Sequence, residues 1–166
     1  MTARRRRVRS HGLAEARRAI GGLDFFRRMM AGDVPRAPMT ALLNLRLLEA
    51  DEGRVVFSAV PTAAHYNGMD IVHGGLAAAL LDSALGCAVN TMAPPGQIFT
   101  TLEMKINFTR PLTRKVGLIR CEGKVVHMGS RVATAEGRVV DKHGKLYAHG
   151  TATCILFEPS RKTRAT

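Results

Sequence analysis

One stretch of this sequence combines residue types that can do chemistry at a carbonyl group. It begins with His73-Gly74-Gly75 and continues to residue 91 as an apolar run with a single carboxylate, Asp82. Unpaired N–H groups at a helix start, with the positive end of the dipole behind them, can stabilise an oxyanion. A carboxylate can activate water or attack a carbonyl carbon directly. The stretch could therefore act at a carbonyl, with Gly74 and Gly75 as oxyanion donors and Asp82 as general base or nucleophile. The alternative is that the glycines only allow a tight entry into a buried helix.

The run after Gly74 predicts one helix, over residues 75–91, that is apolar on every side. It is shorter than the ~20 residues that a membrane span needs, and it contains Asp82 and Gly86. We therefore expect a core helix wrapped by the rest of the domain, with Asp82 buried near its middle. A buried carboxylate is costly unless compensated, so Asp82 is either functional or a structural residue that caps neighbouring backbone.

Spacing along this helix decides how the candidate groups can cooperate. Asp82 lies eight residues beyond Gly74, which is about 12 Å at ~1.5 Å per residue. A reacting carbonyl must lie near both its oxyanion donor and its base, so one chain cannot supply both groups to one substrate. If both are catalytic, a two-fold axis that sets two such helices antiparallel would make two equivalent shared sites.

An additional helix is expected ahead of the sheet. Apolar residues recur at three- and four-residue steps over residues 13–31, with a kink or break at Gly21-Gly22. This helix is either a lid over the core or, through the side chains of Phe25, Phe26, Met29 and Met30, the lining of a substrate channel.

The remaining elements are β-rich runs with turns between them. They cover residues 41–48, 54–60, 101–109, 116–128, 131–141 and 145–157. Short links after residues 127 and 141 predict antiparallel pairing. From Leu102 to Phe108, apolar and polar residues alternate, so one face of that strand should be buried. The fold class is thus α+β, with a curved antiparallel sheet around the central helix and an extra N-terminal helix.

Composition bounds the domains and partners. The chain has 166 residues, three widely spaced cysteines and a net charge of +12. Much of the charge lies in an arginine-rich arm, residues 1–12, expected to be disordered, and in a basic tail, residues 159–166, leaving one domain over residues 13–158. This distribution argues against a nucleic-acid role, the cysteine usage favours the cytoplasm, and the scattered histidines predict no metal site. No cofactor or membrane partner is expected.

The motifs together resemble a known family. They are His65-Tyr66-Asn67, Val72-His73-Gly74-Gly75, Asp82-Ser83-Ala84, Gly86-Cys87-Ala88, Thr101-Leu102-Glu103-Met104-Lys105, Asn107-Phe108 and Arg110-Pro111. The sequence is similar to hot-dog-fold acyl-CoA thioesterases of the phenylacetate-pathway (PaaI-like) type, from about residue 38 to residue 157. The resemblance implies hydrolysis of an acyl-CoA by a homodimer with shared sites, commonly paired into a homotetramer.

Helper residues follow from this resemblance. Asn67 matches a loop asparagine that could position water or donate to the carbonyl, with a turn residue as the alternative. Thr101 matches a hydroxyl that helps to hold water near the carboxylate. His73 could cap or gate the helix, and a structural role is favoured because it has no visible orienting partner. Asp70 departs from relatives that carry a small residue there, which leaves the geometry of the loop open.

Coenzyme A carries phosphates, so the mouth of the site should be basic. Arg131 and Arg110 match positions where relatives have phosphate-contacting or channel-lining residues, and Lys105 is a further candidate. The loop of Tyr66 should shape the acyl pocket at the dimer interface. The identity of the acyl group stays open, as do two other activities: a hot-dog enoyl-CoA hydratase or dehydratase, and a non-catalytic acyl-CoA-binding regulator with a basic arm for DNA.

Overall fold

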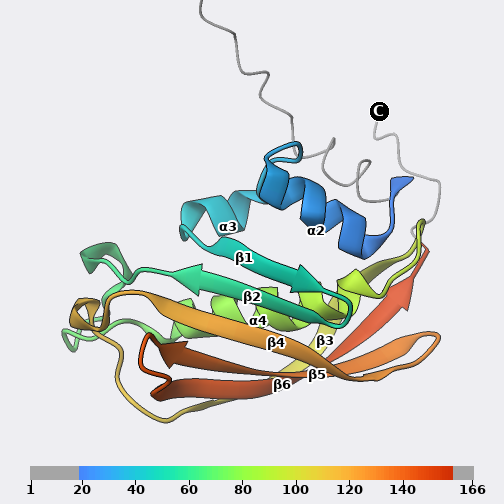
Figure 1. Cartoon of the computed structure of the whole chain (residues 1–166). Coiled ribbons are helices and arrows are strands. Elements are labelled where there is room, and N and C mark those ends of the chain that lie inside the picture. The colour runs from blue at the N-terminus through green and yellow to red at the C-terminus, as the bar shows by residue number, and fades with distance from the viewer. Residues whose placement is uncertain (1–18, 159–166) are drawn as a thin grey trace, which may run out of the picture.

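A computed structural model describes residues 19–158, in which a six-stranded antiparallel sheet curves around one long helix (Figure 1). The elements are α2 (Gly22–Ala31), α3 (Pro38–Leu42), β1 (Arg46–Asp51), β2 (Arg54–Ala59), α4 (Gly74–Thr91), β3 (Ile98–Phe108), β4 (Ile119–Met128), β5 (Val132–Asp141) and β6 (Leu146–Phe157). The strand order is β1-β2-β4-β5-β6-β3, so β1 and β3 are the two edges. This arrangement confirms the predicted hot-dog fold, including the central helix and a helix ahead of the sheet.

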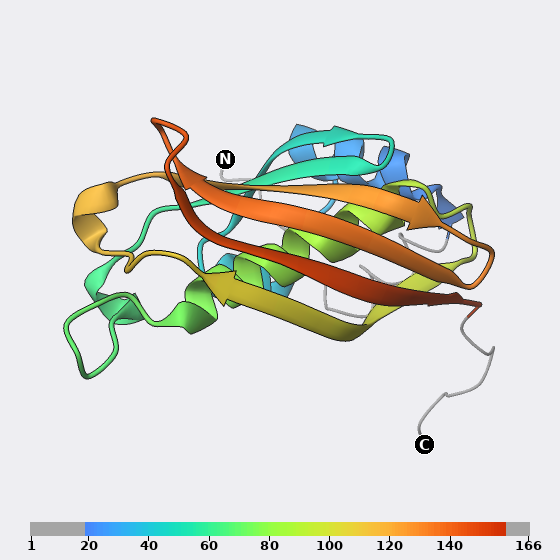
Figure 2. The ribbon, with the colours of Figure 1, turned by 90° about the horizontal axis from the view of Figure 1, so that it is seen from below.

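A row of glycines crosses the sheet, and its members on β4 and β5 let α4 lie close against it. Gly123 of β4 pairs with Gly137 of β5, which pairs with Gly150 of β6. A Cβ atom on Gly123 would come within 2.4 Å of the carbonyl oxygen of Ala84 in α4. Three leucines of α4 fill the space beside this row and are fully buried: Leu80, Leu81 and Leu85. Figure 2 shows α4 running beneath the concave side of the sheet.

The sheet covers only one side of α4, which corrects the expectation that the helix is wrapped all round. Asp82 is exposed, and its neighbours Ala79 and Ser83 are only half-buried. The sequence misleads here because alanines, a serine and glycines line the uncovered side. Such small residues are also common in buried helices, so the sequence does not distinguish an uncovered side from a buried one. The predicted burial of Asp82 is therefore wrong for the single chain.

The elements ahead of β1 differ in detail from the prediction. The helix of residues 13–31 is broken at the glycine pair, as the sequence suggested: Gly21 is extended, α2 begins at Gly22, and residues 13–18 lie outside the described part. Residues 41–48 were expected as one strand, but Pro38 starts the short helix α3 and β1 begins only at Arg46. Asn44, in the left-handed region with φ of 51°, makes the turn between them.

The start of α2 packs on the far end of α4. The backbone N–H of Gly22 donates to the carbonyl of Ala93 at 3.1 Å. A Cβ atom on Gly22 would overlap the carbonyl of Asn90, so only glycine fits this crossing. Phe25 and Phe26 are buried beneath α2. The N-terminal helix α2 is thus held against the central helix α4 by this hydrogen bond and by packing.

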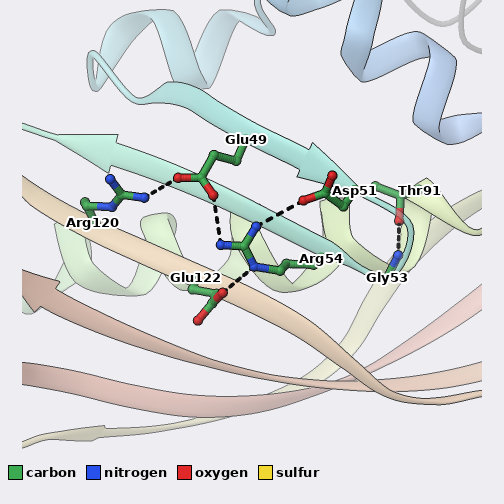
Figure 3. A network of polar contacts seen from close by, with 7 residues as sticks. All are labelled: Glu49, Asp51, Gly53, Arg54, Thr91, Arg120 and Glu122. Atoms are coloured by element: carbon green, nitrogen blue, oxygen red, sulfur yellow. Dashed lines mark hydrogen bonds and ion pairs between the residues drawn. The ribbon is translucent and has the colours of Figure 1, made fainter.

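A polar network joins β1, β2 and β4 (Figure 3). Arg54 pairs with Glu49 at 2.8 Å, with Asp51 at 3.1 Å and with Glu122, and Glu49 also pairs with Arg120. The hydrogen bond from Arg54 is the main cause that lowers the pKa of Glu49. Because these side chains are partly exposed, we assign the network a role in strand register more than in stability.

The same region ties the β1–β2 turn to the end of α4. The N–H of Gly53 donates to the hydroxyl of Thr91 at 2.7 Å, and that hydroxyl donates to the carbonyl of Ala88 at 2.6 Å. Both ends of the bonded chain are backbone groups, so Thr91 fixes the last turn of α4 against the sheet.

Two predicted segments lie outside the described residues, and a third prediction concerns membrane-spanning helices. The basic arm, residues 1–12, and the basic tail, residues 159–166, lie outside the described residues. In residues 19–158, no helix has the length and apolar character needed to cross a membrane.

Candidate active site

Asp82 projects from the uncovered side of α4 toward the edge strand β3. Its Oδ1 accepts a hydrogen bond from the hydroxyl of Thr101 at 2.9 Å. The bond fixes the direction of an otherwise exposed carboxylate, and leaves its other oxygen without a hydrogen-bond partner among the described residues. Such an oxygen is available to a water molecule or a carbonyl carbon.

A β-bulge aims Thr101 at Asp82. Thr101 pairs with Cys154 of β6 and Glu103 with Thr153, so Leu102 is the extra residue on β3. Bulges re-aim side chains, and here the alternation from residue 102 shifts by one. Leu102 is consequently 60% exposed, which corrects the predicted burial of that residue, and Thr101 lies on the helix side of the sheet.

Beneath Thr101 lies a thiol that is not a second nucleophile. Cys154 is fully buried, and burial raises the pKa of its thiol, with the charge of Asp82 acting in the same direction. A protonated thiol is a poor nucleophile. Cys154 is therefore not a competing nucleophile beside Asp82.

The start of α4 offers one free donor. His73 is the N-cap residue, and its Nδ1 accepts the N–H of Gly75 at 2.8 Å. This bond gives His73 the capping role that the sequence favoured, and it occupies Gly75. The N–H of Gly74 has no partner among the described residues. Of the two glycines, only Gly74 therefore has an N–H free for an oxyanion.

Gly74 opens into a cavity of about 390 Å³ together with Asn67, Arg110 and Phe108. A Cβ atom on Gly74 would lie 3.1 Å from the ring of Phe108, so the glycine leaves room there. The Oδ1 of Asn67 accepts a hydrogen bond from the N–H of Met69 at 2.9 Å, which closes a local turn. This bond fixes the orientation of the side-chain amide of Asn67. Asp70 is exposed with φ of 56°, in the left-handed region.

The predicted basic residues do not gather in one place within the chain. Arg110 lines the Gly74 cavity and donates to the carbonyl of Leu146 at 2.7 Å. Lys105 pairs across the sheet with Thr151 and lies on the face away from α4. Arg131 lies in the β4–β5 turn, where its carbonyl accepts the N–H of Leu156. That turn is at the end of β3 where Thr101 lies, and not at the Gly74 end.

Two further cations were missed by the sequence analysis. Arg114 and Lys115 share a cavity of about 580 Å³ with Tyr66 and Asp70. The phenol oxygen of Tyr66 accepts the backbone N–H of Arg114 at 2.9 Å, which joins the two loops. Their only sequence signal was the basic pair after Arg110-Pro111, and a short loop with cations is common on any surface.

Asp82 and Gly74 thus belong to separate parts of the single chain. Asp82 is absent from the cavity that Gly74 lines. Within residues 19–158, no group of three or more His, Cys, Asp or Glu side chains is placed to hold a metal ion.

Comparison with known proteins fits this arrangement. Residues 69–148 match the family described as the Thioesterase superfamily. A protein of Archaeoglobus fulgidus named "Putative esterase" is 30% identical over 112 residues, which cover 68% of this chain and 70% of that protein. The chain belongs to the thioesterase superfamily. It is a thioester hydrolase, which sets aside the hydratase and regulator alternatives.

Solved structures agree with this thioesterase in fold. A phenylacetic acid degradation-related protein from Ralstonia eutropha JMP134 is 30% identical with a TM-score of 0.72, covering 78% of this chain and 98% of that one. The PaaI protein from the E. coli phenylacetic acid degradation operon is 22% identical with a TM-score of 0.70, covering 80% of this chain and 92% of its own. The PaaI-like hot-dog resemblance is confirmed.

Proposed function

We propose that this thioesterase hydrolyses acyl-CoA thioesters at sites shared between two subunits. Asp82 of one subunit acts as general base or nucleophile, and the N–H of Gly74 of the partner subunit stabilises the oxyanion. The observation that carries the proposal is the separation of an oriented, exposed carboxylate from a free helix N-terminus on one helix. Eight residues of helix put about 12 Å between them, too far for one carbonyl.

Strand β3 explains how two copies would bring these groups together. It is an edge strand of 11 residues with Leu102 60% and Phe108 57% exposed, the kind of edge that pairs with another strand. Thr101, beside Asp82, and Phe108, beside Gly74, are about 23 Å apart along it at ~3.3 Å per residue. Antiparallel pairing about a two-fold axis near its middle would set Thr101 against the partner's Phe108. Each Asp82 would then face Gly74 of the partner subunit.

The chemistry then follows from these groups. As a base, Asp82 takes a proton from water, the hydroxide adds to the thioester carbon, and the N–H of Gly74 stabilises the resulting oxyanion. Collapse expels the CoA thiolate, which takes up the proton, leaving a carboxylic acid. As a nucleophile, Asp82 would attack the thioester carbon and displace the CoA thiolate, and water would then hydrolyse the resulting anhydride to the free acid and the Asp82 carboxylate. Arg110, Arg114 and Lys115 beside the helix start offer charge to the phosphates of CoA.

The role of Asp82 is tested by Asp82→Asn and Asp82→Ala with an acyl-CoA and detection of free thiol. Loss of turnover in both, with unchanged thermal midpoints, supports the proposal. Turnover near that of the natural protein in both would remove Asp82 from the chemistry.

The donor role of Gly74 is tested by a variant that removes its N–H alone. Gly74 is the first residue of α4, a position that accepts proline because no helical partner is lost. Gly74→Pro should lower kcat by about 100-fold or more, the usual cost of one oxyanion donor. Gly74→Ala is the matched control, because it adds a similar contact with Phe108 and keeps the N–H.

Mixing variants distinguishes shared from single-chain sites. In a mixed dimer of Asp82→Ala and Gly74→Pro subunits, one site carries both changes and the other carries neither. A shared site therefore recovers activity when the two inactive proteins are mixed and allowed to exchange. No recovery from proteins that are shown to exchange subunits would refute the shared site.

A further inference from the structure

A third cavity, of about 380 Å³, lies between the N-terminal helices and α4. Its walls come from α2, α3, β1, β2 and the second half of α4, and they are mainly aromatic and aliphatic: Phe25, Phe26, Met29, Leu47, Phe57 and Cys87. The volume falls in the range of small-molecule sites, about 300–1,000 Å³. Arg36 and Arg46 also line the cavity, and both are exposed to solvent. None of the groups assigned to catalysis lies in this cavity.

The cavity and Asp82 lie along the same helix, α4. Cys87 and Asn90 line it and follow Asp82 by five and eight residues. Cys87 is therefore about 7.5 Å from Asp82 along the helix axis, at ~1.5 Å per residue. The residues between them on this side are small, Ser83 and Gly86.

Gly86 has no side chain, and the aromatic ring of Phe99 occupies the space that this leaves on α4. A Cβ atom there would come within 2.4 Å of the ring of Phe99, so the ring lies directly on the helix backbone. The surface from Asp82 to the cavity thus carries no long side chain from α4 and is flanked by an aromatic ring.

We propose that this cavity holds the acyl chain of the substrate and that α2 sets the chain length accepted. The inference rests on the proposed function, since it places the thioester carbonyl at Asp82. A hydrocarbon chain is the occupant that suits aromatic and methionine walls, because each buried methylene improves binding by about fourfold. Specificity would then be decided by Met29 and its neighbours on α2, apart from the helix start and Asp82.

The experiment measures kcat/KM over a straight-chain series from acetyl-CoA to dodecanoyl-CoA. Met29→Trp fills the cavity and should lower kcat/KM for dodecanoyl-CoA by about tenfold, equivalent to roughly two buried methylenes, with acetyl-CoA unchanged within about twofold. Met29→Ala, which enlarges the cavity, should move the optimum to longer chains. Ala31→Trp is the matched control, because Ala31 is exposed on α2 and does not line the cavity.

The outcomes separate the cavity from the proposed function. If the natural protein hydrolyses the series and both Met29 variants keep its chain-length preference, the cavity assignment is wrong and the function stands. If the natural protein hydrolyses no member, the function fails and a binding measurement decides on the cavity. Alkylation of Cys87, followed by mass spectrometry, should be slowed by dodecanoyl-CoA and not by CoA alone; equal rates would overturn the proposal.

Cys87 suits this measurement because the other described thiols are protected. Cys121 and Cys154 are buried, and burial raises the pKa of both thiols. Cys87 is half-buried in the cavity wall. The alkylated residue therefore reports on occupancy of this cavity.

Discussion

Replacing Gly123 by alanine tests whether close contact between the sheet and α4 holds the fold. The added Cβ would lie 2.4 Å from the carbonyl oxygen of Ala84 and 2.5 Å from its carbonyl carbon. Both atoms belong to the backbone of α4, which three buried leucines hold in place, so no side chain can move aside. The helix itself must lift away from β4.

The cost follows from two opposing effects. Overpacking a core costs about 1–3 kcal/mol, and a backbone obstacle puts Gly123→Ala at the upper end. The substitution also restricts the unfolded chain, which returns about 0.4–1 kcal/mol. We expect a net loss of roughly 2 kcal/mol, which lowers the thermal midpoint by roughly 4–8 °C for a chain of this length.

Calorimetry and urea unfolding measure this loss, with Gly68→Ala as the matched control. A Cβ atom on Gly68 would meet nothing within 4 Å, so the control reports the effect of the alanine on the unfolded chain alone. A Gly123→Ala protein as stable as Gly68→Ala would refute the claim that the glycine row sets the distance between helix and sheet.

Three more predictions concern single hydrogen bonds. Thr91→Val leaves the N–H of Gly53 without its acceptor and should cost about 1–3 kcal/mol in urea unfolding, whereas Thr91→Ser should cost less. Thr101→Val frees Asp82 to rotate and should lower kcat by about tenfold, with Thr101→Ser close to the natural protein; equal values for the two would contradict the positioning role. Burial alone would raise the pKa of Asp141, but the N–H groups of Lys145 and His143 and the hydroxyl of Tyr147 lower it. The stabilisation of the fold by the Asp141 carboxylate is therefore present above the usual carboxyl pKa and is lost as the pH falls through the lowered pKa. The loss in free energy of unfolding caused by Asp141→Asn should be complete at neutral pH and become smaller below about pH 4.

The central helix and the antiparallel strands could be predicted from sequence because their signals are local. The apolar run after Gly74 and the proline pair beyond it bound α4 to within one residue. Short turns fixed which of the later strands are neighbours. In contrast, Pro38 and Asn44 turn the first half of an apparent strand into a helix, a local effect that the apolar pattern of residues 41–48 hides.

The geometry of the candidate site could be predicted only in part. Asp82 and Thr101 were both identified, but their direct hydrogen bond depends on a bulge that one unpaired residue, Leu102, creates between strands distant in sequence. No pattern within β3 records that the register shifts against β6. The occupation of the Gly75 N–H by His73 likewise depends on a side-chain rotamer and not on spacing.

The prediction that Asp82 is buried was wrong for the single chain, and the dimer that we propose would account for the difference. The side of α4 that the sheet leaves uncovered lies next to the free edge of β3, since Asp82 and Thr101 are hydrogen-bonded to each other. A pattern selected for burial against a second copy is indistinguishable from one selected for the core. The exposed carboxylate and the exposed edge are thus two aspects of the shared site that we propose.

Leu102 gives the sharpest check on that link. It is 60% exposed at the bulge of the edge strand, so Leu102→Lys should place a charged side chain on the edge that pairs and prevent a β3–β3 contact. Sedimentation should then show monomers, and hydrolysis should fall with the dimer although Asp82 and Thr101 are unchanged. Val126→Lys is the matched control, because Val126 is 63% exposed and is also the extra residue of a bulge, but on β4 inside the sheet. An active Leu102→Lys monomer would show that one chain contains a complete site, and the distance argument from Gly74 to Asp82 would then be wrong.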